Sequence, residues 1–85
     1  MNSKFHEIAQ EIATVLEKKD HDYGSKNMTE FGVLGGVVRI SDKTERLKNL
    51  VKKEAKVSEE TLEDTLLDLA GYAILMLKLR REGLI

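Results

Sequence analysis

Three carboxylates and a tyrosine recur at four-residue spacing in the C-terminal third of the chain. Glu60, Asp64, Asp68 and Tyr72 would lie one turn apart on a single stripe of a helix. Asp68 falls inside a run that is otherwise apolar, where an unpaired carboxylate is costly to bury. The stripe therefore predicts a facing cation. One hypothesis is Mg²⁺ on Glu60, Asp64 and Asp68; the other is an arginine or lysine paired with Asp68, with Glu60 and Asp64 as ordinary surface acids.

A second group of residues that could bind a ligand lies in the middle of the chain. Arg39, Lys43 and Arg46 would share one sector of a helix with Asp42 and Asn49. Cations on one face could bind phosphate oxygens, and arginine can do so through two parallel hydrogen bonds. Asp42 could hold a metal or orient Arg46. The alternative is a ladder of ion pairs on a solvated helix face.

The segment from residue 20 to residue 27 is rich in turn-forming residues. Its two aspartates and Gly24 differ from a calcium-binding loop, because the glycine comes one place early and Phe31 stands where the bidentate acid belongs. A calcium-binding loop is therefore excluded. One hypothesis is a turn that places Tyr23 or Lys26 over a bound base or phosphate. An ordinary connection between two helices is the other.

The elements that must position these residues are three helices in a single all-α domain that covers residues 1–85. Apolar spacing and turn residues predict helices over 3–19 and 29–55, then a helix that starts after Ser58 as its N-cap and ends near a Gly83 cap. Two long helices would form a hairpin, with the N-terminal helix beside it. The last helix is apolar on nearly every side, which predicts a homo-oligomeric helical bundle.

Composition excludes several classes of function. The net charge of −1 gives no general attraction to nucleic acid polymers or to anionic membranes. With no cysteine, the chain has no disulfide, thiolate zinc site or thiol nucleophile. The N-terminus leads into an amphipathic helix, and the longest apolar run is too short to span a bilayer. We therefore expect a cytoplasmic protein.

Three sequence blocks, in this order, resemble a known family. The blocks are Lys-Asp-His-Asp-Tyr-Gly (19–24), Arg-Ile-Ser-Asp-Lys-x-x-Arg-Leu-x-x-Leu (39–50) and Glu-x-x-x-Asp-Thr-Leu-Leu-Asp-Leu-Ala-Gly-Tyr (60–72). They resemble the nucleotide modification associated domain family of phages and prophages, which is itself similar to the MazG-like all-α nucleoside triphosphate pyrophosphatases. The resemblance implies an all-helical oligomer that handles nucleotides, with Mg²⁺ on carboxylates of the third helix, in the host cytoplasm if a phage encodes it.

The chain also departs from the pyrophosphatase pattern. Those enzymes carry a Glu-x-x-Glu pair on one helix, whereas this chain has Arg39, Asp42 and Glu45 in that region. Their later Glu-x-x-Asp pair appears here as Glu60 and Asp64, one residue wider. Fewer carboxylates favour nucleotide binding over metal-dependent cleavage. Three hypotheses follow: a Mg²⁺-dependent nucleotide pyrophosphohydrolase, a binder that sequesters a nucleotide-derived defence signal at a subunit interface, and a structural oligomerisation module.

Overall fold

The computed structural model describes residues 4–52 and 59–85, apart from the side chains of residues 20–23, 59 and 60. All regular structure in these residues is helical. The helices are α1 (Lys4–Tyr23), α2 (Ser25–Lys52) and α3 (Glu59–Arg81). The predicted all-α, three-helix chain is confirmed. The predicted end of the second helix at Ala55 and the Ser58 cap lie outside the described residues.

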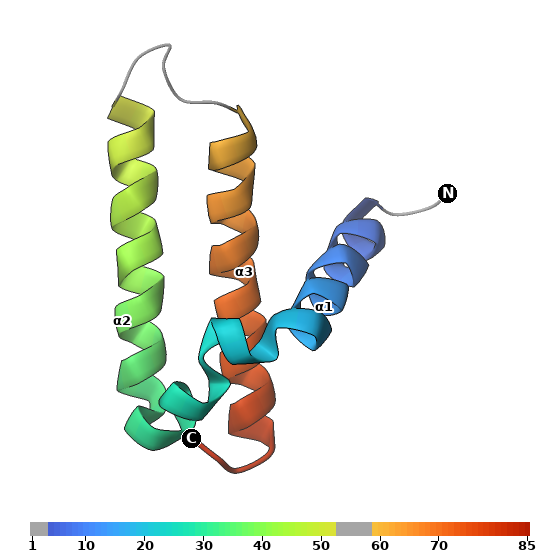
Figure 1. Cartoon of the computed structure of the whole chain (residues 1–85), viewed down its shortest axis with the longest axis vertical. Helices are drawn as coiled ribbons and strands as arrows, with labels where there is room; N and C mark the ends of the chain where they lie inside the picture. The colour runs from blue at the N-terminus through green and yellow to red at the C-terminus, as the bar shows by residue number, and fades with distance from the viewer. Residues whose placement is uncertain (1–3, 53–58) are drawn as a thin grey trace.

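The two long helices run side by side in opposite directions, and α1 leans away from them while it contacts α3 (Figure 1). The core that joins the three helices is small. It centres on Met28, Tyr72, Leu75 and Leu79, with Val15 and Leu16 of α1 packed against it. Tyr72, a predicted site residue, is therefore part of the core, which fixes its ring relative to all three helices.

Close approach of α2 to α3 depends on a glycine. Gly36 is buried, and a Cβ at this position would lie 2.5 Å from the Sδ of Met76 on α3. The missing side chain lets the two helix backbones pack closely beside the core. The same stretch of α2 carries Arg39, so this contact helps to set the distance from Arg39 to α3.

The connection between α1 and α2 is shorter than the sequence predicted. The predicted turn over residues 20–27 is wrong in its extent, because α1 continues to Tyr23 and the turn is confined to Gly24, whose φ is +76°. Two breaks inside the helices supply the bends instead. Lys19 has non-helical φ and ψ of −122° and 27°, and Gly32 has φ of 70° and ψ of −157°. Residues 25–31 therefore form a short arm that leads from α1 across the lower part of the hairpin to the rest of α2 (Figure 1).

The end of α3 matches the predicted glycine cap. The N–H of Gly83 donates to the carbonyl oxygen of Arg80 at 3.1 Å, and the N–H of Leu84 donates to that of Leu79 at 2.9 Å. With Gly83 at φ of +76°, this is the Schellman pattern. The cap turns the chain so that Ile85 packs against the core.

Within residues 4–52 and 59–85, no helix is both long enough and apolar enough to cross a bilayer.

We predict that Gly32→Ala destabilises the fold by about 1–3 kcal/mol, the cost of holding an alanine in backbone space that glycine alone enters readily. No described atom lies within 4 Å of a Cβ at this position. The added methyl group therefore meets no neighbour, and the loss of stability reports the backbone strain alone. Chemical denaturation at fixed protein concentration measures the change. Ser41→Ala, on an exposed helical position, is the control; equal stability of the two variants would contradict the strained geometry of Gly32.

Candidate functional site

Four polar residues of α2 and one tyrosine of α3 line a single cavity of about 380 Å³. They are Arg39, Asp42, Lys43, Arg46 and Tyr72. The α2 residues recur at spacings of three and four, so they share one face of the helix along its seam with α3. The predicted cationic cluster therefore lies in one concave site that α3 helps to close. We call it the cationic cavity.

Three residues contact the Arg39 guanidinium. Its Nη2 donates to Oδ1 of Asn27 at 3.4 Å, and its guanidinium carbon lies 5.9 Å from the centre of the Tyr72 ring. Gly24 packs against the same group, because a Cβ on Gly24 would lie 2.6 Å from Nη2 of Arg39. Contacts of this kind reduce the rotamer freedom that a long cationic side chain loses when it binds a ligand.

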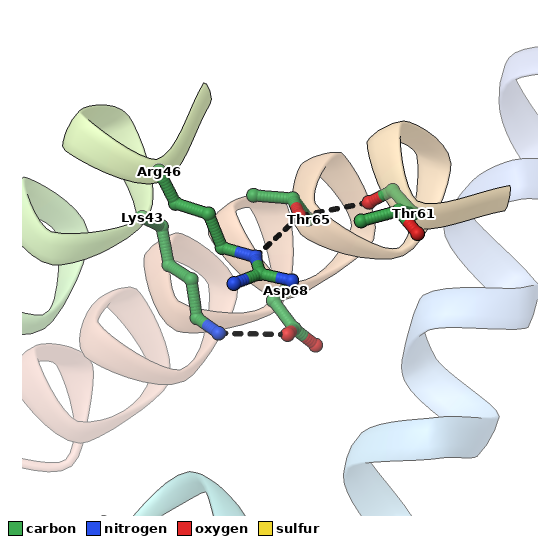
Figure 2. Close-up of polar contacts among 5 residues, drawn as sticks. All are labelled: Lys43, Arg46, Thr61, Thr65 and Asp68. Atoms are coloured by element: carbon green, nitrogen blue, oxygen red, sulfur yellow. Dashed lines mark hydrogen bonds and ion pairs between the residues drawn. The ribbon is translucent and has the colours of Figure 1, made fainter. Parts of the chain in front are cut away.

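Lys43 forms an ion pair with the carboxylate that the sequence singled out. Its Nζ lies 3.0 Å from Oδ2 of Asp68 on α3 (Figure 2). The two side chains are 26% and 39% exposed. Of the two hypotheses for Asp68, the structure therefore shows a lysine from α2 facing it.

Arg46 reaches the same helix one turn further along. Its Nε donates to Oγ1 of Thr65 at 3.3 Å, and this hydroxyl donates to the carbonyl oxygen of Thr61 at 2.8 Å (Figure 2). Thr65 is 2% exposed, so its hydroxyl is a fixed acceptor. Sequence reasoning missed Thr65. Its signal was a threonine four residues after Thr61 and three before Asp68, on the α3 face that points toward α2.

The acid stripe borders a second cavity, of about 450 Å³, between α1 and α3. Asp64, Asp68 and Tyr72 line it with Lys19 and the apolar side chains of Ile12, Val15 and Leu67. Tyr72 thus borders both cavities, and the Lys43–Asp68 pair joins a residue of one to a residue of the other. Lys19, at the break in α1, is a second cation at the acid stripe that the sequence analysis did not assign.

The described side chains contain no group of three or more His, Asp or Glu residues arranged to hold a metal ion. The predicted three-carboxylate set cannot be compared in full, because the side chain of Glu60 lies outside the described residues. Asp64 and Asp68 do share one cavity.

The remaining predicted site residues are not brought together. Lys26 and Asn49 are exposed, and neither lines the two cavities described above. Tyr23 ends α1, and its side chain lies outside the described residues. Its neighbour Gly24 and the nearby Asn27 contact Arg39 instead. Both belong to the segment that the sequence analysis treated as a turn near the site.

Fold and site together define a small all-helical protein with a cationic cavity between its two long helices. Each sequence block supplies part of this site: Gly24 from the first, Arg39 from the second and Tyr72 from the third. The model of the family described as nucleotide modification associated domain 1 matches residues 19–79. The chain belongs to this family. No curated protein and no solved structure matches it.

We predict that Lys43 and Asp68 are coupled by about 0.2–1 kcal/mol in a double-mutant cycle of Lys43→Met and Asp68→Asn, the range for partly exposed pairs. Urea denaturation of the four proteins gives the coupling. The Lys78–Glu82 pair, 62% and 46% exposed, serves as a reference. A loss of about 3 kcal/mol from Asp68→Asn alone would contradict this assignment, because it would indicate a buried cation left without its partner.

Proposed function

We propose that the protein binds a nucleotide or a nucleotide-derived small molecule, with the phosphates in the cationic cavity. One observation carries the proposal: Arg39, Lys43 and Arg46 line the same cavity. Membership of a nucleotide modification associated family supports the ligand class. The net charge of −1 makes this cation cluster a local feature, unlike the broad basic surface that binds a nucleic acid polymer.

The spacing of the two arginines suits more than one phosphate. Arg39 and Arg46 are seven residues apart, which corresponds to about 10 Å along a helix axis. Lys43 lies between them. Two guanidinium groups at this separation can each bind a phosphoryl group through paired hydrogen bonds, with the lysine as a point charge between them. A polyphosphate, or a nucleotide derivative with two separated phosphates, has the matching length.

Mg²⁺ fits the acid side of the site as an accompanying ion. This ion is commonly bound by one or two carboxylates together with phosphate oxygens. Asp64 and Asp68 would hold it, and it would supply positive charge beside the phosphates. Lys43 pairs with Asp68, so it competes with a cation for that carboxylate. A phosphate that draws Lys43 away would leave Asp68 available to the ion.

Hydrolysis of the MazG-like kind is the second candidate. The cavity that carries Asp64 and Asp68 favours it, because metal-dependent attack on a phosphate needs carboxylates beside the phosphate site. Two observations count against hydrolysis. Asp68 already forms an ion pair with Lys43. Glu45 is exposed and pairs with Lys48 at 3.4 Å, and it does not line the cationic cavity. We therefore propose binding without cleavage, which suits a protein that sequesters a nucleotide-derived signal.

We predict that Arg39→Ala and Arg46→Ala each weaken nucleoside triphosphate binding about 10- to 150-fold, equivalent to about 1.5–3 kcal/mol for a charge-assisted hydrogen bond. Isothermal titration with Mg²⁺ present measures the affinity, and rising salt should weaken it. Lys48→Ala is the matched control, because Lys48 is 60% exposed and pairs with Glu45 on the solvent side of the same helix.

Equal effects of all three substitutions would contradict a phosphate site on α2 and favour the structural module. The same mixtures, assayed for released pyrophosphate, separate the two candidate functions. We expect ligand recovered intact after incubation with the wild-type protein and Mg²⁺. Pyrophosphate release that Asp68→Asn abolishes would assign the hydrolase instead.

We also propose that the chain is a homo-oligomer. Twelve large apolar side chains are exposed in the described residues, against five buried hydrophobic residues. Val33, Val37 and Val51 of α2 are among the exposed set. A largely apolar groove of about 580 Å³ between α2 and α3 is lined by Val33, Ala73, Met76 and Leu77, and it shares no residue with the cationic cavity. A second copy could cover this groove without blocking the phosphate site.

We predict a mass at least twice the monomer mass of 9.6 kDa by light scattering at micromolar concentration. Leu77→Glu should lower that mass toward the monomer value, because a carboxylate in an apolar interface is costly. Leu66→Glu is the control, since both leucines are 49% exposed on α3 and only Leu77 lines the groove. A wild-type mass near 10 kDa would contradict the oligomer, and equal effects of the two variants would contradict this interface.

A further inference from the structure

A further concave surface adjoins the cationic cavity at the residues that the two share. This groove, of about 470 Å³, runs along the start of α2 and is lined by Asn27, Phe31, Leu34, Val38, Arg39 and Asp42. Arg39 and Asp42 also line the cationic cavity. The two hollows therefore meet at these residues. A ligand whose phosphates contact Arg39 can extend directly into the groove.

The floor of the groove is apolar although it lies beside charged groups. Phe31 is 60% exposed, Leu34 is 72% exposed and Val38 is 52% exposed. Gly35 lies between them, and a Cβ there would lie 3.0 Å from the Cβ of Phe31. The absence of that side chain keeps the surface next to the Phe31 ring open. An exposed aromatic ring at the edge of a phosphate site suits a flat heterocycle, which every nucleobase offers.

The backbone explains why Phe31 stands there. Gly32 breaks α2 directly after Phe31, and its φ of 70° turns the arm of residues 25–31 relative to the rest of the helix. Asn27, four residues earlier on the same arm, contacts Arg39. The break therefore brings an aromatic ring and an amide to the same end of the cationic cavity.

We propose that the base of the bound nucleotide stacks on Phe31 in this groove while its phosphates occupy the cationic cavity. This inference rests on the proposed function and adds the position of the base. Asp42 lies at the boundary of the two hollows. An ionised carboxylate accepts hydrogen bonds but has no hydrogen to donate. It therefore selects a base with an exocyclic amino group, such as cytosine, over one that presents a carbonyl at the same position, such as uracil.

The decisive comparison uses one ligand with a base and one without. CTP and inorganic tripolyphosphate carry the same chain of three phosphoryl groups, so a loss confined to CTP reports on the base. We expect Phe31→Ala to weaken CTP binding about 5- to 150-fold, the range for loss of one base–aromatic stack, and to leave tripolyphosphate binding unchanged. Phe31→Trp should retain CTP binding. Phe5→Ala, at an exposed phenylalanine of α1, should change neither ligand.

If Phe31→Ala lowers the affinity for both ligands equally, or for neither, the base site is overturned. The phosphate site is then tested separately by Arg46→Ala. If the wild-type protein binds neither ligand, the proposed function itself fails. A second copy of the chain is the other occupant that could cover Phe31. A fall in the oligomeric mass of Phe31→Ala, measured by light scattering, would assign the groove to that contact and overturn the inference.

A matched pair of ligands tests the role of Asp42. CTP and UTP differ at position 4 of the ring, where one carries an amino group and the other a carbonyl. We expect the wild-type protein to bind CTP at least 5-fold more tightly than UTP, and Asp42→Ala to remove the difference. Removal of the negative charge beside the phosphates acts on both ligands alike, so the ratio of the CTP and UTP affinities is the readout. Equal wild-type affinities would overturn the role of Asp42.

Discussion

The guanidinium of Arg39 is the point on which the arrangement of this protein depends. The turn at Gly24 packs against it, Asn27 accepts a hydrogen bond from it, and the Tyr72 ring lies beside it. These contacts come from the connection between α1 and α2, from the short arm before Gly32 and from the centre of α3. Because Tyr72 also belongs to the core, a change in the packing of the helices would move Arg39. Folding and the shape of the cationic cavity are therefore set by the same contacts.

The Lys43–Asp68 pair links the two polar cavities. Lys43 lines the cationic cavity, and Asp68 lines the cavity between α1 and α3. A phosphate bound near Lys43 would compete with Asp68 for the ammonium group, and a cation near Asp68 would compete with Lys43 for the carboxylate. Binding of the phosphate and binding of the cation each break the Lys43–Asp68 ion pair. Phosphate and cation binding should therefore assist one another through this single contact.

Sequence patterns predicted the helices, the glycine cap at Gly83 and the shared face of Arg39, Lys43 and Arg46, because these features depend on local spacing. They could not predict the breaks at Lys19 and Gly32, because both residues lie inside the predicted helices and local spacing does not reveal which residue of a helix takes a non-helical conformation. The identity of the cation at Asp68 was also open, because it depends on how α2 packs against α3. Thr65 and Phe31 were missed for a related reason. An apolar or hydroxyl side chain acquires a role beside a charged site only through tertiary packing.

The most direct test of phosphate binding at this site observes the arginine side chains themselves. The chain has four arginines, Arg39, Arg46, Arg80 and Arg81, so its Nε–Hε signals can be assigned individually by nuclear magnetic resonance. The two arginines at the end of α3 are internal controls, because they lie outside the cationic cavity. On titration with tripolyphosphate, the signals of Arg39 and Arg46 should shift in a saturable way while those of Arg80 and Arg81 stay in place. Equal, non-saturating shifts of all four signals, or no shift at Arg39 and Arg46, would contradict the account.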